Sequence, residues 1–524
     1  MGSAVTINGS TIDVLPGVSL FDCAERIGIC VPTSCNKQGK CKECIVEVVE
    51  GGELLSAPAP QEQHLSGPFR LSCRAQVTGE GSIRCHTMRR GRMRIENRGA
   101  GLPTAEVAAN RRAGYGLALD LGTTTVVLRL VNLQTGEIVA DTSFENPQRF
   151  AGSEIMARIH YDSTHPGKLQ RRVLAGYLSR AIREFPVQPE SIREMVVAGN
   201  STMRDLFFRL SVYSIGQSPY RSITEIEMAE GKRASTSLQE TGRRCLLPID
   251  PQALVYGAPV ISGHVGADAA ACMLAVDLAH EDRLVAIMDI GTNTELIVGN
   301  RHRILAASCP AGPAFEGGAI ACGMPALDGA IERVRIDDAG RFHLEVIGGG
   351  KPAGICGSGL VSLMSELMRT GQMNERGRFE DGIERITVDE AGEVYFLESD
   401  VNELAQAKGA NVAGLQAVFS NYGIRFGDVE VFYLAGGFGR RLDVDAAIRI
   451  GLIPAIPKSR IVQVGNAAIE GATIALVSES KRREMEELAR RVEHCRLETH
   501  PRFFDFFVDG CQFGPVSPIE QAAV

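Results

Sequence analysis

The sequence lacks the long apolar run that a membrane-spanning helix needs, because no stretch of about 18 consecutive apolar residues occurs in it. Its N-terminus lacks the basic segment followed by an apolar segment that marks a secretory signal. It also lacks a clustered basic face, since the lysines and arginines are scattered and the net charge is -8. We therefore expect a cytoplasmic protein that binds neither membranes nor nucleic acid.

Length and composition are those of a multidomain globular protein. The chain has 524 residues, enough for roughly three to four domains. One basic cluster exists, MRRGRMR at 88–94, and we interpret it as a solvated part of a linker. The chain also has 14 cysteines, which in the cytoplasm argue against disulfides and for free thiols or metal ligands.

Four cysteines form a recognisable ligand pattern. Cys35, Cys41 and Cys44 lie in SCNKQGKCKEC, and Cys73 follows in RLSCRAQV, which gives C-x5-C-x2-C-x28-C. Zinc sites usually show two close pairs of ligands, and the bacterial four-iron run C-x2-C-x2-C-x3-C-P is absent. Three clustered cysteines with one distant cysteine favour a [2Fe-2S] cluster over structural zinc or free thiols.

The residues around these cysteines predict a β-grasp ferredoxin domain, which we assign to residues 1–85. Asn8-Gly9 between two alternating segments indicates a β-hairpin with a type I′ turn. Ser19 and Gly28 bracket a short amphipathic helix. A further strand follows the cysteine loop, so that hairpin, helix, cysteine loop and strand come in the ferredoxin order.

Other cysteines have weaker claims to a cluster. Cys23 lies on the apolar face of the predicted helix and is expected in the core. For Cys30 the sequence leaves two alternatives, a cluster ligand or a free thiol. Cys309, Cys322 and Cys356 have no recognisable spacing, so we expect separate buried thiols there rather than a second cluster.

A strand–turn–strand pattern occurs twice in the rest of the chain. It is YGLALDLGTTTVVLRLVNLQTGEIV at 115–139 and LVAIMDIGTNTELIVGN at 284–300. Gly122 and Gly291 allow each turn to approach a phosphate closely, and Asp120 and Asp289 can hold Mg²⁺ at the strand ends. The residues that offer hydroxyl, amide and backbone donors to phosphate oxygens are Thr123, Thr124, Thr125, Thr292 and Asn293.

Further glycine-rich turns suit the same nucleotide site. In VEVFYLAGGFGRRL (429–442), a buried strand leads to Gly436 and Gly437, whose bare backbone would lie under the adenosine. Gly357, Ser358 and Gly359 open a helix, where free N–H groups would meet phosphate or ribose. The glycine- and proline-rich segment 309–331 is expected to be a loop near the cleft.

Two carboxylates are candidates for catalysis. Asp289 lies in the second hairpin, and the spacing of Glu295 from Asp289 points Glu295 toward the same cleft, where it would orient water. Glu316 is a further possible water-orienting group. The alternative for each glutamate is a surface or hydrogen-bonded carboxylate without a role in chemistry.

The two hairpins followed by the Gly-Gly turn resemble the superfamily of actin, the sugar kinases and the large heat-shock chaperones. That resemblance implies an α/β, ribonuclease H-like ATPase with two lobes and ATP in the cleft between them. We place a linker at 86–113, the first lobe, or middle domain, at 114–280 and the C-terminal lobe at 281–524. The simpler alternative is a pair of glycine-rich hairpins in an ordinary α/β fold. The whole chain is thus expected to combine α+β and α/β domains.

A ferredoxin domain joined to such an ATPase resembles the reductive activators of corrinoid proteins. That family's motifs occur here in order, and they are the cysteine loop at 35–44 with Cys73, DLGTTT at 120–125, ENPQRF at 145–150 with ARI at 157–159, AGNSTM at 198–203, DIGTNTE at 289–295, GICGSGL at 354–360, AKGANVAG at 407–414 and AGGFG at 435–439. Two departures are Ser153-Glu154, where a Gly/Ala-Asp pair is expected, and the lack of ferredoxin-type C-x2-C-x2-C runs after residue 73.

The resemblance implies an ATP-hydrolysing reductase that returns the cobalt of a corrinoid protein from Co(II) to Co(I). Its cofactors would be a [2Fe-2S] cluster, ATP and Mg²⁺, its partner a corrinoid protein of a methyltransferase system, and its broad lobes would allow a homodimer. Three alternatives are an ATP-driven activator of a non-corrinoid enzyme, a small-molecule kinase with a fused redox module, and an actin-type filament.

Overall fold

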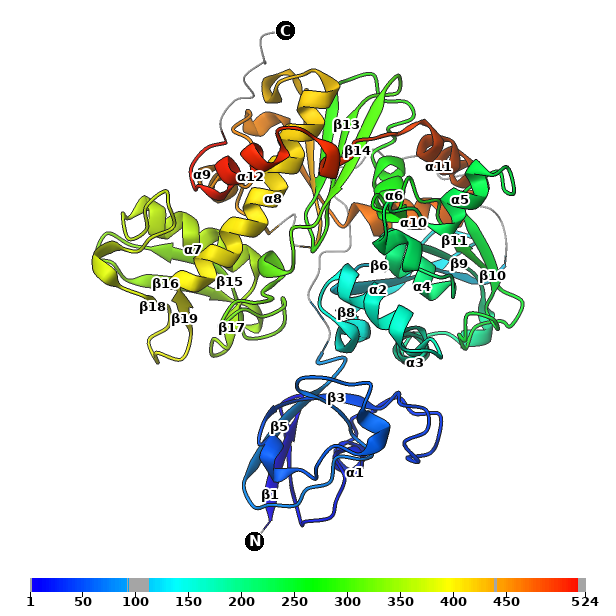
Figure 1. Ribbon diagram of the computed structural model, residues 1–524, viewed down its shortest axis with the longest axis vertical. Coiled ribbons are helices and arrows are strands. Elements are labelled where there is room, and N and C mark those ends of the chain that lie inside the picture. Colours follow the sequence, from blue (N-terminus) through cyan, green and yellow to red (C-terminus); the bar gives the residue numbers. More distant parts are fainter. Residues whose placement is uncertain (1, 92, 94–112, 438–440, 517–524) are drawn as a thin grey trace.

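The computed structural model describes residues 2–91, 93, 113–437 and 441–516. Figure 1 shows three parts, with the N-terminal domain in blue at one end and two larger α/β lobes beyond it. Among the described helices, none is long and apolar enough to cross a membrane.

The N-terminal domain is built on a sheet of five strands in the order β2-β1-β5-β3-β4. Its predicted hairpin is confirmed, because Asn8 and Gly9 both have positive φ and join two antiparallel strands. Ser19 caps the predicted helix by accepting a hydrogen bond from the Asp22 amide at 3.1 Å. The elements are β1 Ser3–Ile7, β2 Ser10–Val14, α1 Leu20–Arg26, β3 Ile45–Glu50, β4 Phe69–Leu71 and β5 Ser82–Thr87.

The first of the two larger lobes has a six-stranded sheet in the order β10-β11-β9-β6-β7-β8. The side chains of β6 alternate between two cores, with Leu117 and Leu119 on the face that packs on α3 and Ala118 on the face covered by α6 and α10. The strands are β6 Tyr115–Leu121, β7 Thr125–Asn132, β8 Ile138–Glu145, β9 Ile192–Gly199, β10 Leu238–Thr241 and β11 Leu254–Gly257. The helices are α2 Ile155–Thr164, α3 Leu169–Arg183, α4 Ser201–Phe207, α5 Ile223–Ala229 and α6 Ala267–Ala275.

The second lobe repeats this plan with a sheet in the order β21-β20-β12-β13-β14-β22. Its strands are β12 Val285–Asp289, β13 Thr294–Gly299, β14 Ile304–Cys309, β20 Val431–Ala435, β21 Ile461–Gly465 and β22 Glu493–His494. Two smaller sheets contain β15 Ala330–Ile336, β16 Phe342–Val346, β17 Gly354–Ile355, β18 Arg385–Thr387 and β19 Tyr395–Leu397. The helices are α7 Gly357–Arg369, α8 Glu398–Tyr422, α9 Val444–Arg449, α10 Ala467–Val477, α11 Glu479–Arg491 and α12 Phe503–Cys511.

Helices α10 and α11 return to the first lobe, although the sequence boundary at 280/281 places them in the second. Figure 1 shows both beside α6, and α10 packs on β6 and β9. Buried Arg129 of β7 pairs with Glu470 of α10 at 2.9 Å, and Arg482 of α11 pairs with Glu194 of β9. Because α10 is apolar on almost all sides, it is stable only between two packed surfaces.

The basic segment at 88–94 is not the solvated segment that the sequence predicts, at least over its first three residues. Met88 is fully buried, Arg89 pairs with Glu184 at 2.8 Å, and Arg90 pairs with Glu47 at 3.0 Å. These contacts attach the ferredoxin domain to the first lobe, and β5 continues to residue 87, past the predicted boundary at 85. Most of the predicted linker, 94–112, lies outside the described residues.

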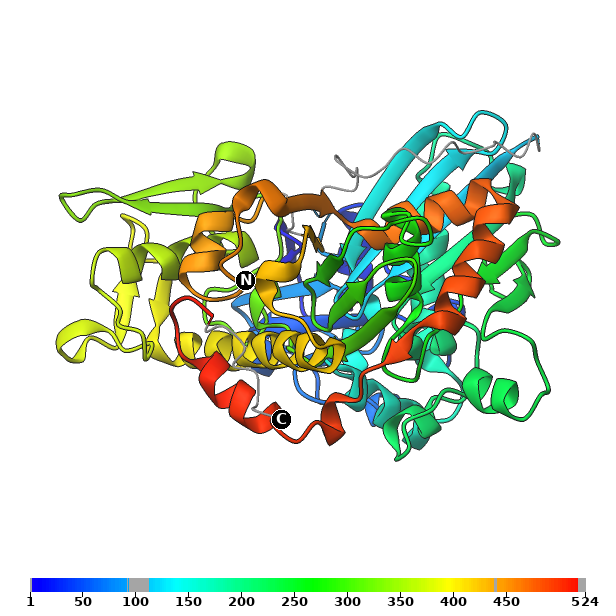
Figure 2. The same ribbon diagram turned by 90° about the horizontal axis from the view of Figure 1, so that it is seen from above.

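The aromatic C-terminal segment packs on its own lobe. Figure 2 shows α12, in red, beside the long helix α8, in yellow. Buried Lys408 of α8 donates to the carbonyls of Gly510 and Gln512, which end α12. Glycines at the crossing allow close approach, since a Cβ on Gly510 would lie 3.0 Å from the carbonyl oxygen of Gly409.

Candidate functional site

The four predicted cluster ligands lie together as two pairs of thiols. Cys35 lies beside Cys41 and Cys44 lies beside Cys73, so that each thiol influences the pKa of its neighbour. The Ser72 amide and hydroxyl both donate to the Cys44 carbonyl, which joins β4 to the cysteine loop. Two thiolates for each of two irons is the ligand arrangement of a [2Fe-2S] cluster.

The backbone of the cysteine loop turns its amides toward the sulfurs. Asn36, Lys37, Gly39 and Lys42 all have φ between 49° and 73°, in the left-handed region. The amides of residues 38, 40 and 41 consequently donate to the Cys35 sulfur. Burial raises the pKa of Cys35, but these donors outweigh it and lower the pKa to about 7. At Cys35 the loop thus favours the thiolate, the form that ligates iron.

The remaining cysteines do not join these pairs. Cys23 is buried in the core, and Cys30 is exposed at a cavity of about 840 Å³ between the ferredoxin domain and α3. The Cys309 thiol donates to the carbonyl of Ala410, and the Cys356 thiol donates to that of Ile331. Within the described part of the chain these are separate thiols, as the sequence predicts.

Three side chains on the surface of the first lobe could also hold a metal ion, but an ammonium already lies among them. Asp277, His280 and Glu484 have ligand atoms within 4.8 Å of one another. The Lys481 ammonium lies 3.0 Å from the Asp277 carboxylate and 2.9 Å from that of Glu484. We therefore assign no metal to this group.

The two predicted phosphate hairpins face each other across the cleft between the lobes. The hydroxyl oxygens of Thr124 and Thr292 are 2.6 Å apart, and a pocket of about 100 Å³ lies beside them. The predicted residues that line this pocket are Asp120, Gly122, Thr123, Thr124, Thr125, Asp289, Gly291, Thr292, Asn293, Glu295, Glu316, Gly436 and Gly437. The structure thus brings together residues from four segments that are far apart in the sequence.

One predicted segment does not reach this pocket. Helix α7 begins at Gly357 as predicted, but Gly357, Ser358 and Gly359 are not among its lining residues. Gly359 packs against the Ile331 carbonyl, where a Cβ would lie only 2.2 Å from the oxygen. The close packing of α7 on β15 explains at least this glycine.

Three polar residues that sequence reasoning did not name also line the pocket, namely Asn200, Asp268 and Asn466. The first two lie in glycine-rich turns, 196–203 and 260–268, that the sequence does predict at this cleft. Asn200 donates to the Thr123 hydroxyl at 2.9 Å, and Asn466 donates to the Asp120 carboxylate at 2.7 Å. Each asparagine follows a strand and a glycine and caps the next helix. The repeated Gly-Asn pair after a buried strand, at 199–200 and 465–466, is the signal that could have found them.

Five carboxylates line the pocket, and burial raises the pKa of each. The pKa of Asp120 and that of Asp268 rise to about 7, and that of Asp289 rises to about 6. Glu295 and Glu316 also have raised pKa values from burial. No lysine or arginine lines the pocket among the described residues. Such a set of oxygen ligands without a counter-charge fits a hard divalent cation such as Mg²⁺.

The raised pKa values predict a magnesium effect that grows with pH. A carboxyl group whose folded pKa is raised contributes stability below its unfolded pKa and loses it as the pH rises through its folded pKa, here about 6 to 7. Magnesium binds the ionised form, so it should raise the thermal unfolding midpoint by several degrees more at about pH 8 than at about pH 5.5. Differential scanning fluorimetry with Mg²⁺ and with EDTA tests this, and equal shifts at both pH values would contradict it.

Models of known families match three consecutive parts of the chain. The model of a 2Fe-2S iron-sulfur cluster binding domain matches residues 5–78. The model of the RACo middle region matches residues 115–281, and that of the C-terminal domain of RACo, the ASKHA domain, matches residues 283–520. The two RACo models together match well over half of the chain.

Curated and solved relatives agree with these matches over three quarters of the chain or more. The corrinoid activation enzyme RamQ of Eubacterium limosum is 27% identical, over 96% of this chain and 97% of that protein. The [Co(II) methylated amine-specific corrinoid protein] reductase of Methanosarcina barkeri is 25% identical, over 75% of this chain and 76% of that protein. The solved structure of a reductive activator for corrinoid, iron-sulfur protein is 25% identical, with a TM-score of 0.71 over 98% of both chains.

Proposed function

This chain belongs to the RACo family of reductive activators of corrinoid proteins, and from that premise we propose that it returns the cobalt of a corrinoid protein from Co(II) to Co(I) in an ATP-dependent step. The observation that carries the proposal is the presence in one chain of paired cluster thiols and a two-lobed cleft with facing hairpins. The partner is a corrinoid protein of a methyltransferase system.

In this proposal Cys35 and Cys41 would hold one iron, and Cys44 and Cys73 would hold the other. When bound, the [2Fe-2S] cluster supplies one electron at low potential, about -400 mV for the plant type. The inward-turned amides of the loop favour the thiolate form, and burial of Cys41, Cys44 and Cys73 excludes water from three of the four sulfurs.

In the cleft, Asp120 and Asp289 would hold magnesium, and the hairpin hydroxyls and amides would orient the phosphates. Asn466 fixes the Asp120 carboxylate through its 2.7 Å hydrogen bond. Glu295, whose carboxylate accepts from the Ser308 hydroxyl at 3.1 Å, is placed to orient the attacking water. We therefore assign Asp289 and Glu295 as the catalytic carboxylates. The negative charge of neighbouring Asp268 helps to raise the pKa of Glu295.

ATP is needed because reduction of the partner is uphill from such a cluster. A difference of 100 mV costs about 2.3 kcal/mol per electron, and coupling between two binding sites typically supplies about 1–3 kcal/mol. The hydroxyl contact between Thr124 and Thr292 joins the two lobes at the phosphate position. A nucleotide phosphate bound there would separate the two hydroxyls and so change the relative position of the lobes. We infer that this change controls docking and release of the corrinoid protein.

Stimulated ATP hydrolysis tests the partner class. With Co(II) corrinoid protein added, the steady-state ATPase rate should rise by about tenfold or more, within the usual range of coupling. Apoprotein of the same partner, without its corrinoid, is the matched control and should stimulate less. An ATPase rate that no corrinoid protein changes would contradict the proposed partner.

A small-molecule kinase is the second candidate, because a cavity of about 570 Å³ opens beside Thr292 and Asn293. It lies between α2 of the first lobe and α8 of the second, where an acceptor of a phosphoryl group would have to bind. Transfer of labelled phosphate from ATP to a panel of sugars and carboxylic acids would favour this candidate. Release of inorganic phosphate alone would exclude it for that panel.

A further inference from the structure

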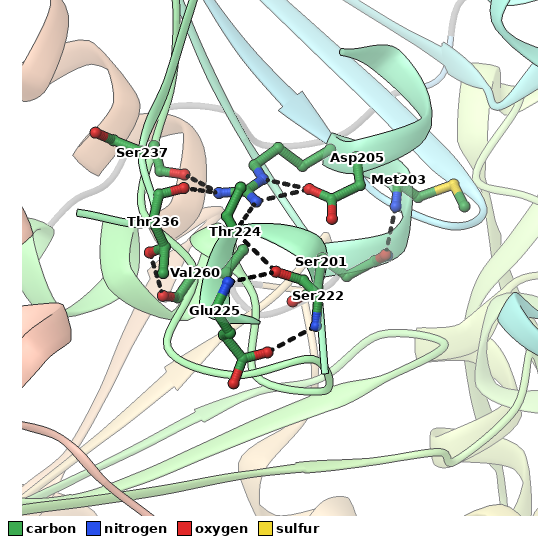
Figure 3. A network of polar contacts seen from close by, with 12 residues as sticks. Ser201, Met203, Asp205, Ser222, Thr224, Glu225, Thr236, Ser237 and Val260 are labelled. Atoms are coloured by element: carbon green, nitrogen blue, oxygen red, sulfur yellow. Dashed lines mark hydrogen bonds and ion pairs between the residues drawn. The ribbon is translucent and has the colours of Figure 1, made fainter. Parts of the chain in front are cut away.

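Buried arginines in this protein generally have a carboxylate partner, and Arg158 of α2 does not. Arg129 pairs with Glu470, and Arg204 pairs with Asp205 at 2.6 Å. Figure 3 shows Asp205 within a dense polar network. Arg158 is only 1% exposed, yet no ion pair to it is formed within the described residues. A buried guanidinium without a carboxylate is costly unless another state of the protein supplies one.

The present contacts of Arg158 are weak for a charged group. Its Nε donates to the Gly152 carbonyl at 3.0 Å, and its Nη1 donates to the Met203 sulfur at 3.1 Å. A thioether is a poor acceptor. Burial lowers the pKa of Arg158 to about 9, so the side chain is still charged at neutral pH. The negative charge of the Glu316 carboxylate raises the pKa of Arg158 and partly offsets the effect of burial. The Met203 sulfur also accepts from Asn146, which donates to the Gly122 carbonyl of the first hairpin, so Arg158 lies close behind that hairpin. Glu316 of the second lobe reaches the same hairpin through Thr292 and Thr124.

Glu316 is held at the phosphate position by a hydroxyl. It ends the short turn Ala314–Glu316 and accepts a hydrogen bond from Thr292, whose oxygen lies 2.6 Å from that of Thr124. Two oxygens at that distance leave no room for a phosphate between them. A phosphate that enters between the hairpins must separate these hydroxyls, and its negative charge repels the Glu316 carboxylate.

We propose that Arg158 is a positioning residue that receives the Glu316 carboxylate when a nucleotide phosphate parts Thr124 from Thr292. The resulting ion pair crosses the cleft, joins α2 to the second lobe and withdraws one negative charge from the phosphates. This inference rests on the nucleotide site proposed above. It explains why a charged side chain is kept buried behind a pocket that is lined by carboxylates and, among the described residues, by no cation.

A charge-removal cycle tests the pair through the dissociation constant of Mg·ATP, measured by isothermal titration calorimetry. Arg158→Met leaves Glu316 unpaired against the phosphates and should weaken binding at least about tenfold, within the usual range of coupling. Glu316→Gln changes a residue of the pocket, so its own dissociation constant is the reference for the second half of the cycle. The double variant also lacks the Arg158 charge and should bind within about threefold of Glu316→Gln, because the carboxylate that Arg158 would receive is already gone.

The double variant separates an electrostatic role from a structural one. If the Arg158→Met change weakens binding as much in the Glu316→Gln background as it does alone, Arg158 only supports the fold and the proposal is wrong. Arg129→Met is the matched control, since it also removes a buried guanidinium, and its effect on binding should be the same with and without Glu316→Gln. If Arg158→Met does not fold, Arg158→Gln takes its place in the cycle with the same expectations.

The same titrations distinguish failure of this inference from failure of the nucleotide site. If the unchanged protein binds no Mg·ATP, the proposed site is wrong, and the Arg158 proposal falls with it. If the unchanged protein binds Mg·ATP and the cycle shows no coupling between Arg158 and Glu316, only the Arg158 proposal is overturned.

Discussion

The Cys41→Ala variant is expected to lose its visible iron–sulfur absorption and to reduce corrinoid protein at least about a hundredfold more slowly. Cys41 is 6% exposed and forms one pair with Cys35, so its removal leaves one iron with a single thiolate. The cleft is built from other segments, and Mg·ATP binding should remain. Absorption spectra and calorimetry on one preparation measure both properties.

Cys30→Ala is the matched control for that experiment. Cys30 precedes the same loop but is exposed and belongs to neither thiol pair, so this variant should keep the cluster and the reduction rate. If Cys41→Ala reduced corrinoid protein at the normal rate, the proposed ligand set and electron source would both be wrong.

The Asp289→Asn variant is expected to show the opposite pattern, with ATP hydrolysis lowered at least about a hundredfold and the cluster spectrum unchanged. Asp289 ends β12 in the phosphate pocket, and the Cys272 thiol donates to its carboxylate at 3.2 Å. An amide cannot supply the negative charge that holds magnesium. Phosphate release under saturating Mg·ATP measures the effect.

Asp282→Asn controls for the loss of one carboxylate in the same region of the chain. Asp282 is exposed and pairs with Arg301 at the surface, so its variant should hydrolyse ATP normally. Undiminished hydrolysis by Asp289→Asn would remove Asp289 from the magnesium and catalytic roles.

The parts of the fold that local rules determine could be predicted from the sequence. Asn8-Gly9 forms the expected hairpin because both residues tolerate positive φ. The two phosphate hairpins form because a buried strand, a glycine and small hydroxyl residues leave few other arrangements. Their meeting across the cleft followed from the family's motif order rather than from either hairpin alone.

What could not be predicted depends on contacts between distant segments. The glycine-rich turn at 260–268 predicts a segment near the cleft, but Asp268 becomes a site residue only because α6 begins beside both hairpins. The basic segment at 88–90 reads as a solvated linker until Glu47 and Glu184 supply its partners. Arg158 likewise carries no local signal, since its burial and lack of a carboxylate are properties of the packed lobes.

The central claim is that ATP enables transfer of one electron to a corrinoid partner. We would mix anaerobically purified protein, with its cluster reduced, with a Co(II) corrinoid protein and follow the visible spectrum of Co(I), with and without Mg·ATP. The account predicts that Co(I) accumulates with Mg·ATP and not without it. No Co(I) with several corrinoid proteins, despite an intact cluster and bound ATP, would contradict it.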